Sequence, residues 1–289
     1  MQGTVDGFGY GLTTPVVAFV MACLGAALGL RCTTRSLRAG RSRRAGWLAL
    51  GATSIGSGIW TMHFVAMLGF TVEEASVTYD RPLTFASLAV AILMVGIGIF
   101  LVGYRGATPM ALVTGGTITG LGVASMHYLG MAGMRFDGQF AYDTPTVSLS
   151  VVIAVVASTA ALWAAVSIHG FLPSLGASVV MGVAVSGMHY TGMAALQVHL
   201  HPGAATGTAG DTPTSLLIPM MIGPGCFLLL AGVIVMFDPL VVTGGPDGPG
   251  RPSGRGLPSG GQALAIPVQR RRTSYATTAR REDRQPRNH

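Results

Sequence analysis

Seven long, nearly uncharged apolar stretches follow one another along this chain of 289 residues. A helix needs about 20 apolar residues to cross the hydrocarbon core of a bilayer. Charged residues make up 10% of the chain, whereas soluble domains carry about 25%. We therefore predict an all-α membrane protein with seven transmembrane helices, over residues 13–31, 47–70, 83–104, 110–134, 147–171, 175–198 and 215–237.

The charges between the apolar stretches predict how the chain lies in the membrane. Short cytoplasmic segments carry an excess of basic residues. The segment from Arg31 to Arg44 contains six arginines and no acid, and the chain after residue 241 is also rich in arginine. The loops after the second and fourth stretches carry mostly acids, namely Glu73, Glu74, Asp80, Asp137 and Asp143. We expect the N-terminus outside the plasma membrane and the C-terminus inside.

The sequence divides into a membrane domain, residues 1–240, and a tail, residues 241–289. The tail is rich in Gly, Pro and Arg and has no apolar periodicity, which predicts a disordered cytoplasmic segment. It is too short for a second folded domain, so we expect any signal to pass to a separate cytoplasmic partner. The Arg31–Arg44 segment and the tail are expected to contact anionic lipid. Neither has interleaved aromatic residues, so we expect no nucleic-acid binding.

A Met-His motif recurs in the second, fourth and sixth predicted helices. The three histidines are 64 and 62 residues apart (127 − 63 and 189 − 127), which fits a repeat of two helices. Each His follows a Met and is followed by another Met four positions later. The motif residues are Met62, His63 and Met67; Met126, His127 and Met131; Met188, His189 and Met193. The predicted fold is three two-helix repeats plus one additional helix.

Small residues precede each motif at helical spacing. Seven residues before each His lies Gly56, Gly120 or Gly182, and eleven residues before lies Ala52, Gly116 or Ser178. On a helix, positions −11, −7, 0 and +4 fall within about 60° of one another. Small residues four apart let membrane helices approach closely. We therefore expect this face to point into the bundle, with the three histidines at one depth near the outer surface.

The chemistry of this layer favours a soft metal ion. Imidazole and thioether are neutral ligands that suit copper, especially Cu(I). No carboxylate lies near the motifs within the predicted helices, which disfavours magnesium, calcium and manganese. The Met before each His lies about 100° away on the helix and suits packing. Two interpretations are open: a metal or ligand site, or histidines that hydrogen-bond between helices among packed methionines.

Different classes of function are compatible with such a layer. One is a sensor, in which a copper centre in the outer leaflet binds a diatomic gas or responds to redox state. Another is copper transport, storage or handling without a signalling role. A haem site is a third, although one layer of three histidines does not supply opposed axial ligands. No nucleophile–base–acid set lies in the predicted helices, so we expect no enzymatic activity.

The three motifs resemble one named family. Residues 188–191 read Met-His-Tyr-Thr, residues 126–129 read Met-His-Tyr-Leu, and residues 62–65 read Met-His-Phe-Val. Over roughly residues 10–240 the sequence is similar to the bacterial MHYT-domain integral membrane sensors. The resemblance implies copper bound by the Met and His residues, and O2, CO or NO as the sensed ligand. Relatives often join this domain to cytoplasmic modules that make or degrade cyclic di-GMP.

Overall fold

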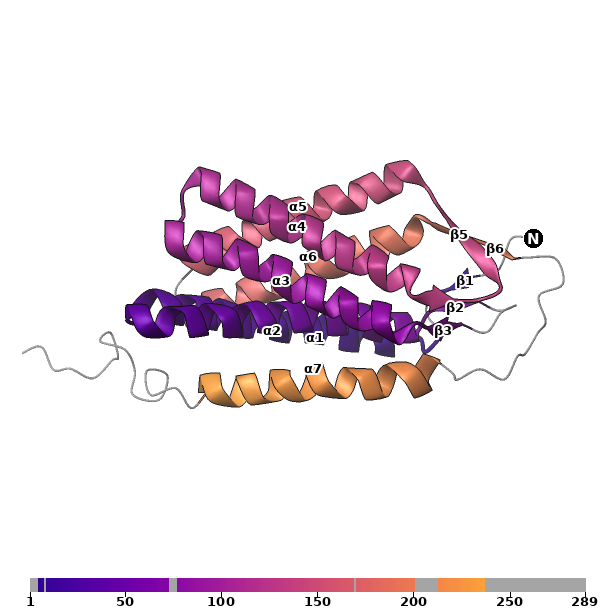
Figure 1. Cartoon of the computed structure of the whole chain (residues 1–289), viewed down its shortest axis with the longest axis horizontal. Coiled ribbons are helices and arrows are strands. Elements are labelled where there is room, and N and C mark those ends of the chain that lie inside the picture. Colours follow the sequence, from indigo (N-terminus) through magenta and orange to yellow (C-terminus); the bar gives the residue numbers. More distant parts are fainter. Residues whose placement is uncertain (1–4, 8, 73–76, 169, 201–212, 237–289) are drawn as a thin grey trace, which may run out of the picture. The chain divides into compact units, whose positions relative to one another are not determined.

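We describe the fold from a computed structural model, which covers residues 5–7, 9–72, 77–168, 170–200 and 213–236. Seven α-helices make up most of this part of the chain (Figure 1): α1 (Thr13–Arg38), α2 (Arg41–Leu68), α3 (Arg81–Arg105), α4 (Pro109–Ala132), α5 (Thr144–Ser167), α6 (Phe171–Ala194) and α7 (Pro213–Met236). Each helix coincides with one predicted stretch, so the all-helical prediction is confirmed. The predicted tail, residues 241–289, lies outside the described residues.

One predicted boundary is wrong. The segment from Arg31 to Arg44 was expected to be a loop, but α1 continues to Arg38 and α2 begins at Arg41. Arg is a good helix former, and no Gly or Pro interrupts residues 31–38. The two helices are joined only by Ala39 and Gly40.

Six of the seven helices in the described part of the chain are long and apolar enough to cross a membrane: α1 and α3 to α7. The remaining helix, α2, is the longest at 28 residues but is less apolar, because its middle is rich in Gly, Ser and Thr. Most of its residues from 51 to 67 are buried against other helices. A helix shielded from lipid by its neighbours does not need a strongly apolar surface.

Helices α1 to α6 form a closed ring. Each packs against the next in the chain, α6 packs back against α1, and α7 lies along α1 and α2 (Figure 1). The glycine seven residues before each motif His marks a close approach between helices. A Cβ at Gly56 would stand 2.8 Å from Ile92 Cα of α3, and one at Gly120 would stand 2.5 Å from Val155 Cα of α5. The small-residue face is therefore confirmed as a helix-packing face.

Short strands, which the sequence did not predict, lie together at one end of the helices (Figure 1). They pair antiparallel as β1 with β2, β3 with β4, and β5 with β6. Their bounds are Val5–Asp6, Thr71–Val72, Thr78–Tyr79, Met134–Arg135, Gly138–Tyr142 and Leu196–Leu200. The pair β3–β4 joins the strand before α3 to the strand after α4, and the pair β5–β6 joins the strand before α5 to the strand after α6.

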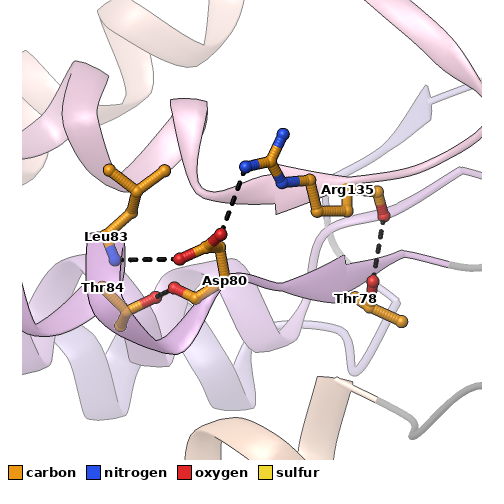
Figure 2. A network of polar contacts seen from close by, with 5 residues as sticks. All are labelled: Thr78, Asp80, Leu83, Thr84 and Arg135. Carbon is orange, nitrogen blue, oxygen red and sulfur yellow. Dashed lines mark hydrogen bonds and ion pairs between the residues drawn. The ribbon is translucent and has the colours of Figure 1, made fainter.

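The polar network at the start of α3 shows how a strand pair and a helix are joined (Figure 2). The Asp80 carboxylate accepts a hydrogen bond from Leu83 N at 3.0 Å and caps the helix. The same carboxylate forms an ion pair of 3.1 Å with Arg135 of β4, and Thr78 donates to the Arg135 carbonyl oxygen. The Leu83 N–H and the Arg135 guanidinium hold the pKa of Asp80 below its usual value.

Candidate metal centre

The three motif histidines meet inside the ring of helices. His63 of α2, His127 of α4 and His189 of α6 each lie five residues before the last residue of their helix, namely Leu68, Ala132 and Ala194. All three are buried, with at most 2% of their surface exposed. We call these residues the His triad. Their equal distance from the helix ends agrees with the predicted single layer.

The contact within the His triad is made by one nitrogen of each ring. The three Nδ1–Nδ1 separations are 3.0 Å between His63 and His189, 3.2 Å between His63 and His127, and 3.3 Å between His127 and His189. The rings meet edge to face, at interplanar angles of 77° to 88°. The Nδ1 atoms therefore form a nearly equilateral triangle.

This triangle cannot close as three hydrogen bonds. Each Nδ1 has a single in-plane position, which holds either a hydrogen or a lone pair. A closed ring would require every nitrogen to donate to one neighbour and accept from the other through that same position. At least two of the three Nδ1 atoms must therefore both carry a hydrogen or both carry a lone pair. Two such like groups facing each other are unfavourable in a buried apolar site. A cation shared by the three lone pairs removes this conflict.

The separations also fit a shared metal ion. Metal–imidazole bonds are about 2.0–2.1 Å, so two nitrogens in a tetrahedral site lie about 3.3 Å apart. Among the His, Cys, Asp and Glu side chains that the structure describes, the His triad is the group of three that lie close enough together to hold a metal ion. No acidic side chain belongs to it. Its donor set is three neutral imidazoles.

Aromatic residues next to the histidines lie against the imidazole rings. Phe64, Tyr128 and Tyr190 each follow a triad His and lie edge-on to it, with ring centroids 4.7, 4.8 and 5.0 Å apart. Phe64 makes the same contact as the two tyrosines. The edge-on contact at this motif position therefore needs an aromatic ring and does not need the tyrosine hydroxyl. The Tyr128 hydroxyl makes a separate contact, 2.7 Å from Ser150 Oγ of α5.

Two glycines that the sequence analysis did not identify make room for the imidazoles. A Cβ at Gly130 would stand 2.6 Å from His63 Nε2, and one at Gly192 would stand 2.5 Å from His127 Nε2. Both Nε2 atoms are buried without a hydrogen-bond partner. Each ring thus reaches into a gap that the next motif helix leaves open. The signal was present in the sequence, since each His is followed three positions later by a small residue, Ala66, Gly130 or Gly192.

The motif methionines lie on the same three helices as the His triad, and most of them are buried. Met67 and Met131, four residues after their histidines, are 1% exposed, and Met193 is half-buried. Helical side chains lean toward the N-terminus of their helix, so those one turn after a His lean back toward its layer. The methionines before each His, Met62, Met126 and Met188, are buried as well. Met62 packs with alanines of α1, as expected for a packing residue.

Comparison with known proteins identifies the family. The family described as "Bacterial signalling protein N terminal repeat", MHYT, matches residues 56–115 and 120–178, which contain the first two motifs. The bifunctional diguanylate cyclase/cyclic di-GMP phosphodiesterase MucR of Pseudomonas aeruginosa is 40% identical over 202 residues, or 68% of this chain. The chain belongs to the MHYT-domain family. With six helices apolar enough to cross a bilayer, this MHYT-domain chain is a multi-pass membrane protein.

Other relatives of this MHYT-domain chain are named for cyclic di-GMP turnover or for signalling. The cyclic di-GMP phosphodiesterase NbdA of Pseudomonas aeruginosa is 35% identical over 70% of the chain, and the signalling protein YkoW of Bacillus subtilis is 30% identical over 66%. The chain spans 29% of the length of MucR, 27% of NbdA and 24% of YkoW. No solved structure matches the chain.

Proposed function

We propose that this chain is a sensor of the plasma membrane that binds one copper ion through the His triad and responds to a diatomic gas or to redox state. The observation that carries the proposal is the triangle of Nδ1 atoms, 3.0 to 3.3 Å apart. The proposed topology has seven crossings, with the N-terminus outside and the triad in the outer leaflet. The basic ends of α1 and α2 would then lie at the inner surface, against anionic lipid.

Copper in its monovalent state suits this site best. The described ligands are neutral, so a divalent ion would leave two uncompensated charges in a buried apolar layer, whereas Cu(I) leaves one. Imidazole and thioether are both ligands that copper accepts, and zinc gains little from thioether. We propose that His63, His127 and His189 hold the ion and that Met67, Met131 and Met193 supply sulfur donors. Bound copper would supply a soft centre able to take O2, CO or NO.

The protein's own residues would convert occupancy into a signal through helix packing. The triad joins α2, α4 and α6, and these helices approach α3, α5 and α1 at Gly56, Gly120 and Gly182. Close-packed interfaces have few alternative arrangements, so a small shift of one imidazole is passed along the whole helix. Since MucR and NbdA are named for cyclic di-GMP turnover, we place the output in cytoplasmic signalling, through a separate partner, and assign no enzymatic role to the membrane domain.

Copper transport or storage is the alternative. A transport path needs ligands at several depths, and within the described residues the candidate metal ligands form a single group near the strand-bearing end. The helix segments on the other side of the His triad line an apolar cavity. This arrangement favours a fixed centre over a pathway.

The test is copper stoichiometry of the full chain purified in detergent. Wild type is expected to hold one copper ion per chain, and His63→Ala, His127→Ala and His189→Ala are each expected to lose it. His199→Ala is the matched control, because His199 lies exposed in β6 and outside the triad. Absence of copper from wild type grown with ample copper, or its retention after all three triad changes, would refute the proposal. Uptake of copper into proteoliposomes would instead support transport.

A further inference from the structure

An apolar cavity lies about one helical turn from the His triad, inside the ring of helices. It has a volume of about 50 Å³. Its lining includes the residues four and eight positions before each triad His, which are Ile59 and Ile55, Val123 and Thr119, and Val185 and Met181. Four residues of helix rise about 6 Å, so the cavity begins one turn from the triad and continues away from it. We call it the triad-base cavity.

Small residues of α5 create this space. Ala154, Ala157, Ala161 and Ala165 recur on one face of that helix and all line the cavity. Met188 lines it as well, and this residue directly precedes His189. One residue of the cavity lining is therefore adjacent in sequence to a triad histidine. A molecule inside the cavity would lie next to the helices that carry the triad.

The lining is mostly apolar and favours small apolar molecules over water. An ordered water needs two to four polar partners. Only two lining residues carry a hydroxyl, Thr119 and Ser158, and the buried Thr119 Oγ1 has no hydrogen-bond partner. A single water-sized molecule occupies at least about 10–15 Å³ in the same measure, so the space suits a molecule of a few atoms.

We propose that the triad-base cavity is a docking site for a diatomic gas, which it holds one helical turn from the His triad. Diatomic gases are nonpolar or weakly polar and dissolve well in hydrocarbon, so they match both the size and the lining of the cavity. The docking site itself rests on the cavity, and its role as the source of ligand for the triad rests on the proposed function. Ligand concentrated beside the triad would raise the rate at which the triad meets it.

Xenon is the probe, because it enters dry apolar cavities and needs no metal. Full-length protein in nanodiscs is titrated with xenon and followed by xenon NMR. Wild type is expected to show a saturable site that is lost in Ala157→Leu, which adds three carbons to the lining, and weakened in the milder Ala157→Val. Ala160→Leu is the matched control, since Ala160 lies on the same helix and is exposed. No saturable site in wild type, or an unchanged site in Ala157→Leu, would overturn the proposal.

Copper measurements on the same samples separate this proposal from the proposed function. Copper content is expected to be equal in wild type and the three alanine variants, because none of the changes touches the triad. With Cu(I) present, the association rate of carbon monoxide is expected to fall in Ala157→Leu and to stay unchanged in Ala160→Leu. Equal rates in both variants would overturn the link between cavity and triad. Copper-free wild type would refute the proposed function, while xenon binding would still decide the docking site.

Discussion

Replacement of Gly192 by Ala perturbs the His triad without removing any proposed ligand. The added Cβ would stand 2.5 Å from His127 Nε2 and 3.0 Å from its Cδ2. Ordinary contacts between such atoms are about 3.5–4.0 Å, so the His127 ring must retreat by about 1 Å. A metal site tolerates only about 0.2 Å in its bond lengths. The substitution is therefore expected to displace His127 Nδ1 from the other two nitrogens.

These displacements set the expected losses of stability and of copper affinity. Overpacking of a buried site costs about 1–3 kcal/mol, which should lower the thermal unfolding temperature of the metal-free protein. Loss of ligand alignment typically weakens metal binding on the order of 10–100-fold. The assay is Cu(I) titration against a competing chelator, together with thermal unfolding in detergent. Gly130→Ala, which would crowd His63 in the same way, should behave alike.

The matched control is Gly187→Ala in the same helix. Gly187 is exposed, and a Cβ there would meet nothing within 4 Å. Because Ala is a better helix former than Gly by about 1 kcal/mol, this change should stabilise the protein or leave it unaffected, and it should leave copper binding unchanged. If Gly192→Ala binds copper as tightly as Gly187→Ala, the argument that the triad depends on this gap is refuted.

Three further predictions concern the framework around the triad. Trp60→Phe should destabilise the protein by about 1–3 kcal/mol in thermal unfolding, because the fully buried Trp60 Nε1 donates to Ser87 Oγ at 3.0 Å; an unchanged unfolding temperature would contradict this. Because the pKa of Asp80 is lowered in the folded protein, its stabilising effect is complete above the usual Asp pKa and is lost as the pH falls below about 4. Asp80→Ala should remove that part of the pH dependence of the unfolding temperature, and an unaltered profile would exclude the role. Gly58→Ala should cost about 1–3 kcal/mol, since its Cβ would stand 2.7 Å from a backbone Cα of α1, whereas Gly46→Ala meets nothing within 4 Å and should be tolerated; equal stability of both variants would argue against the close approach of α1 and α2.

Hydropathy and helix phase predicted the part of the structure that depends on single helices. The seven helices follow from the length of each apolar stretch, and the inward direction of the histidines follows from the small residues on the same face. The common level of the three histidines along their helices was also predictable, because each lies about seven to nine residues before the end of its predicted stretch. These properties depend on spacing along one helix, which the sequence contains directly.

The features that could not be predicted from the sequence depend on contacts between helices. Nothing in the spacing shows that α6 closes on α1, that Nδ1 and not Nε2 points inward, or that Gly130 receives the ring of His63. Two-residue strands such as β3 and β4 are too short to show an alternating pattern. The triad-base cavity arises from alanines of α5 facing residues of five other helices, α1 to α4 and α6, and no single stretch of sequence contains this relation.

X-ray absorption at the copper edge of the purified full-length protein tests the central claim most directly. Three imidazole nitrogens that share one ion predict a nitrogen shell of about three donors near 2.0 Å, with outer-shell scattering typical of histidine. His127→Ala should reduce or abolish that shell, and His199→Ala should leave it intact. Copper that is absent, or bound without imidazole scattering, would contradict the assignment of the His triad as a metal centre.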